Sequence, residues 1–169
     1  AATAYVAYLG KTFWPASLAI FYPYPVGVGV WPAIGSALFL AGVTAVAFRL
    51  ARRAPFFIVG WLWYLGTLVP VIGLVQVGAQ ATADRYTYVP LIGVFIAMAW
   101  GLAELAKTGR TARYAVATLS ATSLVALIPV TREQVRNFTD TVSVFEHALA
   151  VTSNNLVAHN GLGLHLASR

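Results

Sequence analysis

The sequence contains very little charge. Only 9% of its 169 residues are charged and five are acidic, whereas 59% are hydrophobic. A soluble globular domain carries about 25% charged residues, so this chain has too little polar surface to coat a water-soluble particle. The shortage excludes a soluble globular protein and predicts an integral membrane protein whose main partner is the lipid bilayer.

Cysteine is also absent, which excludes disulfides and thiolate metal sites without assigning a cellular compartment. The three histidines, His147, His159 and His165, show no metal-ligand spacing and are expected to face solvent or to pack between helices. Asp and Glu are too few and too scattered for a Ser–His–Asp arrangement. The sequence therefore predicts no metal site, and it leaves open whether a divalent metal takes part.

Long apolar stretches dominate what is present. A membrane-spanning helix needs about 20 apolar residues to cross a hydrocarbon core of about 30 Å. Four stretches qualify, at about residues 31–48, 56–75, 87–105 and 113–130. We predict an all-α fold: a polytopic region of about four transmembrane helices over residues 31–131. In the third stretch, Ala97 and Gly101 lie four residues apart, which allows close helix packing in lipid.

The basic residues indicate the orientation of these helices. They cluster in two short connections, residues 49–55 and 106–113, and the positive-inside rule places both in the cytoplasm. Residues 76–86 and both ends of the sequence then face the periplasm or an organelle lumen. The net charge of +6 is thus an orientation signal, and no nucleic-acid partner is expected. The Ala- and Arg-rich composition favours a bacterial inner membrane over the endoplasmic reticulum.

Residues 1–30 are apolar but interrupted by prolines, which break helices because they lack an amide hydrogen and clash with the preceding turn. We predict a short helix over residues 1–12, followed by an irregular loop on the outer membrane surface. The aromatic residues of this part suit the lipid headgroup level: Trp14, Tyr22, Tyr24 and Trp31. A membrane-spanning helix that ends near Lys11 is the alternative.

Residues 132–169 are more polar and show a helical spacing of apolar residues, which predicts a soluble helical segment on the outward side. Part of it matches the second helix of a tetratricopeptide repeat, through Phe145, Ala148 and Leu149. Leu162–Gly163 falls where the next repeat would carry its Leu-Gly pair, whereas Thr141 and Ser153 replace the usual Ala and Pro.

Tetratricopeptide repeats share a core with their neighbours, so we expect more of them downstream. The sequence begins with Ala and stops within the repeat pattern, and we expect it to be a segment of a longer chain.

The connection at residues 79–90 places Asp84 and Arg85 between two long uncharged runs. A charge at bilayer depth costs at least about 2.5–3.5 kcal/mol, so such residues are rare, paired and often functional. In one interpretation the pair is structural: Asp84 caps the following helix and Arg85 meets lipid phosphates.

The second interpretation is a ligand site. Four polar side chains accompany the ion pair: Gln76, Gln80, Tyr86 and Tyr88. The planar guanidinium of Arg85 suits phosphate recognition, and the Tyr and Gln side chains suit sugar hydroxyls or a diphosphate. The cluster of Asp84, Arg85 and their neighbours favours an anionic ligand at the outer membrane surface.

The stretch Asp84-Arg85-Tyr86, followed by Tyr88-Val89-Pro90 and later by the repeat-like tail, resembles a known family. It is similar to the C-terminal membrane region of the transmembrane, tetratricopeptide-containing O-mannosyltransferases and their bacterial relatives, which are glycosyltransferases of the GT-C architecture. The proline- and aromatic-rich residues 1–30 resemble the external loop that precedes the last membrane helices of that family. The resemblance covers nearly the whole sequence through loose, mostly apolar motifs.

The resemblance implies an enzyme that takes a sugar from a polyprenyl-phosphate carrier at the lumenal or periplasmic face and transfers it to a protein hydroxyl. Arg85 would hold the lipid phosphate, and Tyr86, Tyr88 and Gln80 would line the pocket of the donor, the lipid-linked sugar. The repeats would present or recruit the acceptor protein. The family's catalytic acidic residue lies in an upstream external loop, so no catalytic residue is expected within these 169 residues.

Two other classes of function stay open. A non-enzymatic, membrane-anchored repeat scaffold would recruit partner proteins on the outer side, although a plain anchor does not need the polar cluster around Asp84. A transporter would usually carry polar groups near the middle of the membrane, whereas the predicted cluster lies at its edge.

Overall fold

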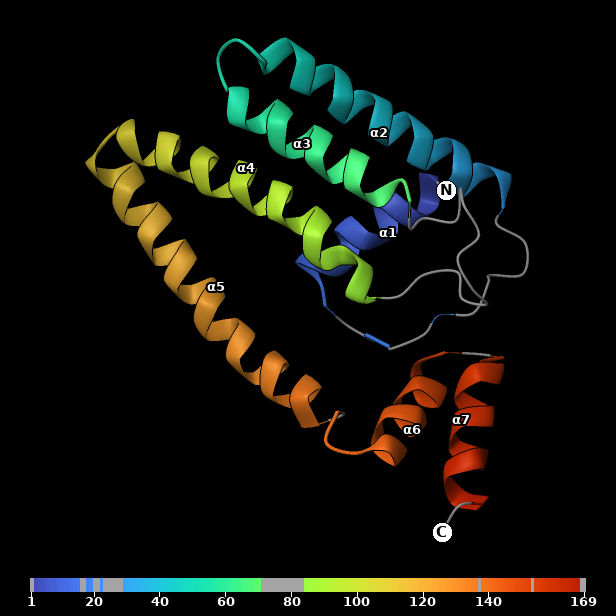
Figure 1. Cartoon of the computed structure of the whole chain (residues 1–169). Helices are drawn as coiled ribbons and strands as arrows, with labels where there is room; N and C mark the ends of the chain where they lie inside the picture. The colour runs from blue at the N-terminus through green and yellow to red at the C-terminus, as the bar shows by residue number, and fades with distance from the viewer. Residues whose placement is uncertain are drawn as a thin grey trace.

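The computed structural model describes residues 2–15, 18–19, 22, 29–70, 84–136, 138–152 and 154–167, and its regular elements there are all helices (Figure 1). In chain order they are α1 (Ala2–Phe13), α2 (Val30–Leu50), α3 (Pro55–Leu68), the 3-10 helix η1 (Asp84–Thr87), α4 (Tyr88–Lys107), α5 (Arg110–Arg136), α6 (Thr141–Val151) and α7 (Leu156–Ala167). The predicted all-α fold class is confirmed for the described residues.

Three of the described helices, α2, α4 and α5, are long and apolar enough to cross a membrane. The predicted span at 56–75 corresponds to α3, whose 14 residues end at Leu68. At 1.5 Å per residue such a helix is about 21 Å long, less than the hydrocarbon core of about 30 Å. Residues 69–70 form a turn, and residues 71–75 of that span lie outside the described residues, so a fourth span stays a prediction.

Prolines explain several helix boundaries. Pro55 is the first residue of α3, and Pro32 and Pro90 lie in the first turns of α2 and α4, where the missing amide hydrogen has no helical partner to lose. Pro129 by contrast lies inside α5. The predicted border between membrane region and tail, at residue 131, falls within this continuous 27-residue helix.

Helices α3 and α4 cross antiparallel with their backbones in contact. A Cβ atom added at Gly60 would overlap the carbonyl oxygen of Gly93 and lie 3.0 Å from the Cβ of Ala97. Further along α3, the Nε1 of Trp63 donates to the carbonyl of Val89, 2.9 Å away. The small residue Ala97 does lie at this crossing, but the closest approach is made by Gly60 and Gly93, which the sequence analysis did not single out.

The most buried side chains join α1 and α3. The fully buried Tyr64 hydroxyl donates to the carbonyl of Tyr5 (2.6 Å), and the Tyr5 hydroxyl donates to the carbonyl of Leu65 (2.8 Å). Trp61 stacks on Tyr64 and donates through Nε1 to Thr44 of α2, 2.9 Å away. These contacts fix α1 against the end of α3 that leads toward residue 68.

The ends of the helices differ in character. The α2–α3 and α4–α5 connections, which carry the basic clusters, lie at one end of the helices, and η1 and the last turn of α1 lie at the other (Figure 1). Helix α5 contacts α4 near their connection and then diverges from it, and none of its residues is buried. Its apolar side chains are therefore available to lipid or to further helices.

The C-terminal helices α6 and α7 form a helical hairpin. The side chain of Asp140 accepts a hydrogen bond from the Ser143 amide and so caps α6 (2.8 Å), and the ring of Phe145 packs directly on Gly161 of α7. A Cβ atom added at Gly163, the glycine of the predicted Leu-Gly pair, would meet no atom within 4 Å. The two helices approach each other at Gly161, and the repeat assignment stays a prediction.

Candidate functional site

The candidate site begins at η1, the single 3-10 turn that leads into α4. The Thr87 hydroxyl donates to the main-chain carbonyl of Asp84, 2.7 Å away. Thr87 is also the N-cap residue of α4, and no side-chain hydrogen bond caps this helix. The interpretation of Asp84 as a cap of α4 is therefore wrong, because its carboxylate points to other segments of the chain.

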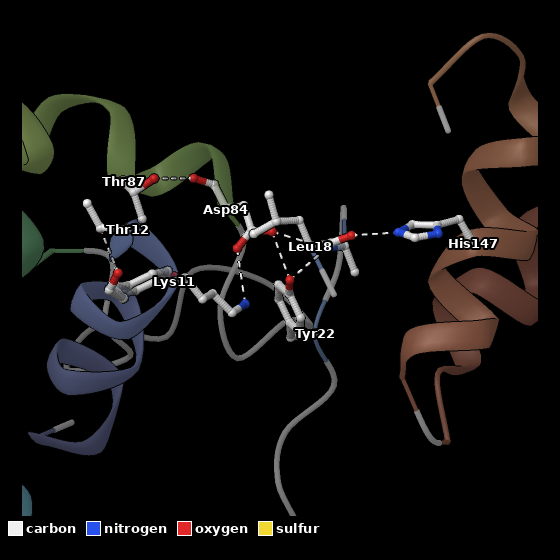
Figure 2. A network of polar contacts seen from close by, with 9 residues as sticks. Lys11, Thr12, Leu18, Tyr22, Asp84, Thr87 and His147 are labelled. Carbon is white, nitrogen blue, oxygen red and sulfur yellow. Dashed lines mark hydrogen bonds and ion pairs between the residues drawn. The ribbon is translucent and has the colours of Figure 1, made fainter. Parts of the chain in front are cut away.

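The Asp84 carboxylate joins three segments that are far apart in the sequence (Figure 2). Oδ1 accepts from the Nζ of Lys11 on α1, at 3.1 Å. Oδ2 accepts from the Tyr22 hydroxyl at 2.8 Å and from the Ala19 amide at 3.1 Å. We call Lys11, Ala19, Tyr22 and Asp84 the Asp84 cluster.

Partial burial sets the electrostatics of this cluster. The side chains of Lys11 and Asp84 are each 26% exposed, and Nζ of Lys11 also lies 3.2 Å from the centre of the Tyr22 ring. Burial lowers the pKa of Lys11, and the neighbouring Asp84 opposes that shift. Burial, reinforced by the hydrogen bond to Asp84, raises the pKa of Tyr22. Tyr22 is thus held as a neutral donor to a charged acceptor, a strong class of hydrogen bond.

The hairpin of α6 and α7 contacts the same region. Nε2 of His147 lies 3.0 Å from the carbonyl oxygen of Leu18, and Figure 2 shows the imidazole ring directed at that carbonyl from the side of α6. Leu18 immediately precedes Ala19, whose amide donates to Asp84. The α6–α7 hairpin is therefore linked through Leu18 and Ala19 to Asp84 of η1.

The predicted site residues are partly brought together. Asp84, Arg85 and Tyr86 form η1, and Tyr88 begins α4. Tyr88 is 75% exposed, and Tyr86 is half-buried. For Arg85 the description covers the backbone only, and Gln76 and Gln80 lie outside the described residues.

Lys11, the ion partner of Asp84, was not predicted from the sequence. A usable signal existed: Lys11 is the single charged residue before Arg49, and Asp84 is the single acidic residue before Glu104. Charges isolated in apolar sequence are expected to pair, so the distant Lys11 was the natural candidate. The contact of His147 with Leu18 has no such signal, because any of the three tail histidines fits the pattern equally well.

The arrangement indicates what the carboxylate does. Three donors already contact the Asp84 carboxylate, which therefore holds three separate segments of the chain together. The part of the chain described here holds no group of three or more His, Cys, Asp or Glu residues that could bind a metal ion. What the site provides is a fixed polar patch where apolar helices end, opposite the two basic connections.

Comparison of the chain with protein-family models, with curated proteins and with solved structures finds no match. The family resemblance consequently depends on the motifs around Asp84 and in the tail. The function has to be inferred from the position and chemistry of the Asp84 cluster.

Proposed function

We propose that this chain is the donor-binding part of an integral-membrane glycosyltransferase. It would move a sugar from a polyprenyl-phosphate carrier to protein acceptors at the periplasmic or lumenal face, most simply of a bacterial inner membrane. The observation that carries the proposal is the position of the Asp84 cluster, at the end of apolar helices and opposite the basic connections at 49–55 and 106–113.

A lipid-linked sugar has the matching geometry. Its polyprenyl tail partitions into the bilayer while its phosphate stays at the interface, the level at which η1 would lie if α2 and α4 cross the membrane. Arg85 follows Asp84 in η1, and a guanidinium binds a phosphate through two parallel hydrogen bonds. A cation positioned in a partly dry site stabilises a departing phosphate far more than it would in water.

The remaining predicted residues would complete the donor site. Tyr86 and Tyr88 extend from η1 into the first turn of α4, and their hydroxyls, with the amides of Gln76 and Gln80, suit sugar and diphosphate oxygens. The α6–α7 hairpin, as the start of a tetratricopeptide array, would present the acceptor protein. The catalytic acidic residue would come from outside these 169 residues.

Arg85→Ala in the intact protein tests the phosphate role. Sugar transfer from a synthetic polyprenyl-phosphate sugar to a protein acceptor is expected to fall by about 100-fold or more, the effect of removing one positioned charge-stabilising donor, while the unfolding midpoint stays unchanged. Arg52→Ala, in the basic connection at the opposite end, is the matched control and is expected to retain activity. Full activity of Arg85→Ala would refute the assignment.

A non-enzymatic, membrane-anchored scaffold is the second candidate. The observation that favours it is the surface of α7, where Leu156 and Leu164 are each 74% exposed and suit contact with a further repeat or a partner protein. The donor lipid separates the two functions. Protection of the intact protein against thermal unfolding by a polyprenyl-phosphate sugar supports the enzyme, and stable capture of an envelope protein without such protection supports the scaffold.

A further inference from the structure

We propose that His147 is a positioning residue, which holds the Asp84 cluster in place through the Leu18–Ala19 peptide group. The inference concerns the coupling of the α6–α7 hairpin to the cluster, and it stands whatever ligand the cluster serves.

One peptide group makes both contacts. The carbonyl of Leu18 lies 3.0 Å from Nε2 of His147, and the amide of Ala19, which belongs to the same peptide plane, donates to Oδ2 of Asp84 at 3.1 Å (Figure 2). Because a carbonyl oxygen only accepts, Nε2 of His147 must carry the hydrogen. The chain of contacts therefore runs in one direction, from His147 through the peptide to the carboxylate.

The geometry of the peptide group makes this link stiff. A trans peptide is planar, and its carbonyl and amide groups point in opposite directions. A donor on one side and an acceptor on the other thus fix the orientation of the same plane. A hydrogen bond accepted by the carbonyl also polarises the amide and strengthens its donation, by roughly 10–30% per bond in condensed-phase estimates. Loss of the His147 contact should consequently loosen Ala19 from Asp84.

The loosening of Ala19 would also affect Tyr22, another member of the Asp84 cluster. Ala19 also donates its amide hydrogen toward the Tyr22 hydroxyl at 2.6 Å, and that hydroxyl itself donates to Asp84. Leu18, which contacts His147, is therefore followed directly by Ala19, and Ala19 contacts both Tyr22 and Asp84. A partner that engages α6 near His147 and a ligand that engages Asp84 would act on the same peptide, and such coupling is reciprocal by thermodynamic necessity.

Hydrogen exchange of the Ala19 amide, measured on the intact protein in lipid nanodiscs by mass spectrometry with single-residue fragmentation, tests the proposal. His147→Ala is expected to speed that exchange about threefold to tenfold, the range for one lost hydrogen bond of ordinary strength. His147→Gln places an amide donor close to the position of Nε2 and should restore slow exchange. His159→Ala, which removes an exposed histidine of α7, is the matched control and should leave Ala19 unchanged.

The reverse direction gives an independent measurement. Asp84→Ala removes the acceptor of the Ala19 amide, and the rate of His147 modification by diethyl pyrocarbonate should then rise at least twofold. Glu104→Ala removes a carboxylate from the ion pair with Lys107 in the last turn of α4 and should not change that rate. Unchanged Ala19 exchange in His147→Ala, or an unchanged His147 modification rate in Asp84→Ala, would overturn the proposal. Both measurements are independent of sugar transfer, so they can fail while the proposed enzyme activity stands, and the converse also holds.

Discussion

The α3–α4 crossing and the Asp84 cluster, which lies where η1 leads into α4, are held together by different forces. At the crossing, Gly60 and Gly93 bring two backbones into contact with no charged group between them. In the Asp84 cluster, an ion pair and three further polar contacts join α1, the loop and η1. The first region depends on shape, since van der Waals packing drives helix association in lipid. The second depends on charge and protonation.

The sharpest test of the α3–α4 crossing is the substitution Gly60→Ala. The new Cβ would overlap the Gly93 carbonyl, and because a backbone atom cannot rotate away, the two helices must separate. We expect a loss of about 3 kcal/mol or more in the free energy of unfolding, at the upper end of the overpacking range. The free energy of unfolding is measured by unfolding the protein in detergent micelles with sodium dodecyl sulfate.

Gly66→Ala in the same helix is the matched control, because its added Cβ meets nothing within 4 Å. An alanine in an open helical position is expected to stabilise by about 0.5–1 kcal/mol relative to glycine. Equal effects of the two substitutions would contradict the close crossing of α3 and α4.

Asp84→Asn tests the Asp84 cluster and should have the next largest effect on the free energy of unfolding. The substitution keeps the shape of the side chain but removes the charge that faces Lys11, 3.1 Å away and partly buried. A hydrogen bond to a charged group contributes about 1.5–3 kcal/mol, and we expect a loss of about 1–3 kcal/mol in the same assay. Glu104→Gln breaks the exposed ion pair with Lys107 and should cost less than about 1 kcal/mol. A larger loss of stability for Glu104→Gln than for Asp84→Asn would contradict a stabilising role of the Asp84 cluster.

These two regions also show what the sequence could and could not predict. Apolar length alone located α2, α4 and α5, because crossing lipid needs a run of apolar residues wherever neighbouring helices lie. It could not locate the helix contacts. The sequence contains 14 glycines, and which of them meets a backbone depends on the register of the partner helix, so Ala97 and Gly101 were singled out and Gly60–Gly93 was not.

The Asp84 cluster could be predicted from the sequence only in part. Asp84 stands out in the sequence because it is a charge among apolar residues. The sequence suggested the adjacent Arg85 as its partner, whereas the partner that the structure provides is Lys11, 73 positions away. Sequence proximity is a poor guide here, since the packing of α1 against α3, which the Tyr64–Tyr5 hydrogen bond helps to fix, brings Lys11 to η1.

Tyr64→Phe tests that connection between the two regions. The fully buried Tyr64 hydroxyl donates to the Tyr5 carbonyl at 2.6 Å, and removing it should cost about 0.5–1.5 kcal/mol, the net contribution of one such bond. Tyr114→Phe, on α5, where no residue is buried, should be neutral. A chemical crosslink between Lys11 and Asp84 by a zero-length carbodiimide should form less efficiently in Tyr64→Phe, because α1 is then less firmly positioned.

The smallest expected effect is a pH dependence of the unfolding free energy, to which only the Asp84 cluster should contribute. Because the pKa of Tyr22 is raised in the folded state, its stabilising contribution is complete below the usual tyrosine value of about 10. That contribution declines as the pH rises above this value, because the unfolded chain then loses the tyrosine proton while the folded chain keeps it. Lys11 acts in the opposite sense: its pKa is lowered in the folded state, so it adds stability as the pH rises toward the usual lysine value of about 10.4.

Tyr22→Phe separates these two opposing contributions. The difference in unfolding free energy between the wild type and Tyr22→Phe should shrink between pH 9 and pH 11, by less than about 1 kcal/mol for a single partly exposed hydrogen bond. Tyr88→Phe removes an exposed hydroxyl at the same end of the helices and should give a difference that does not vary with pH. If Tyr22→Phe behaves like Tyr88→Phe, the Tyr22 hydroxyl does not donate to Asp84, and the ion pair with Lys11 and the Ala19 amide alone hold the carboxylate.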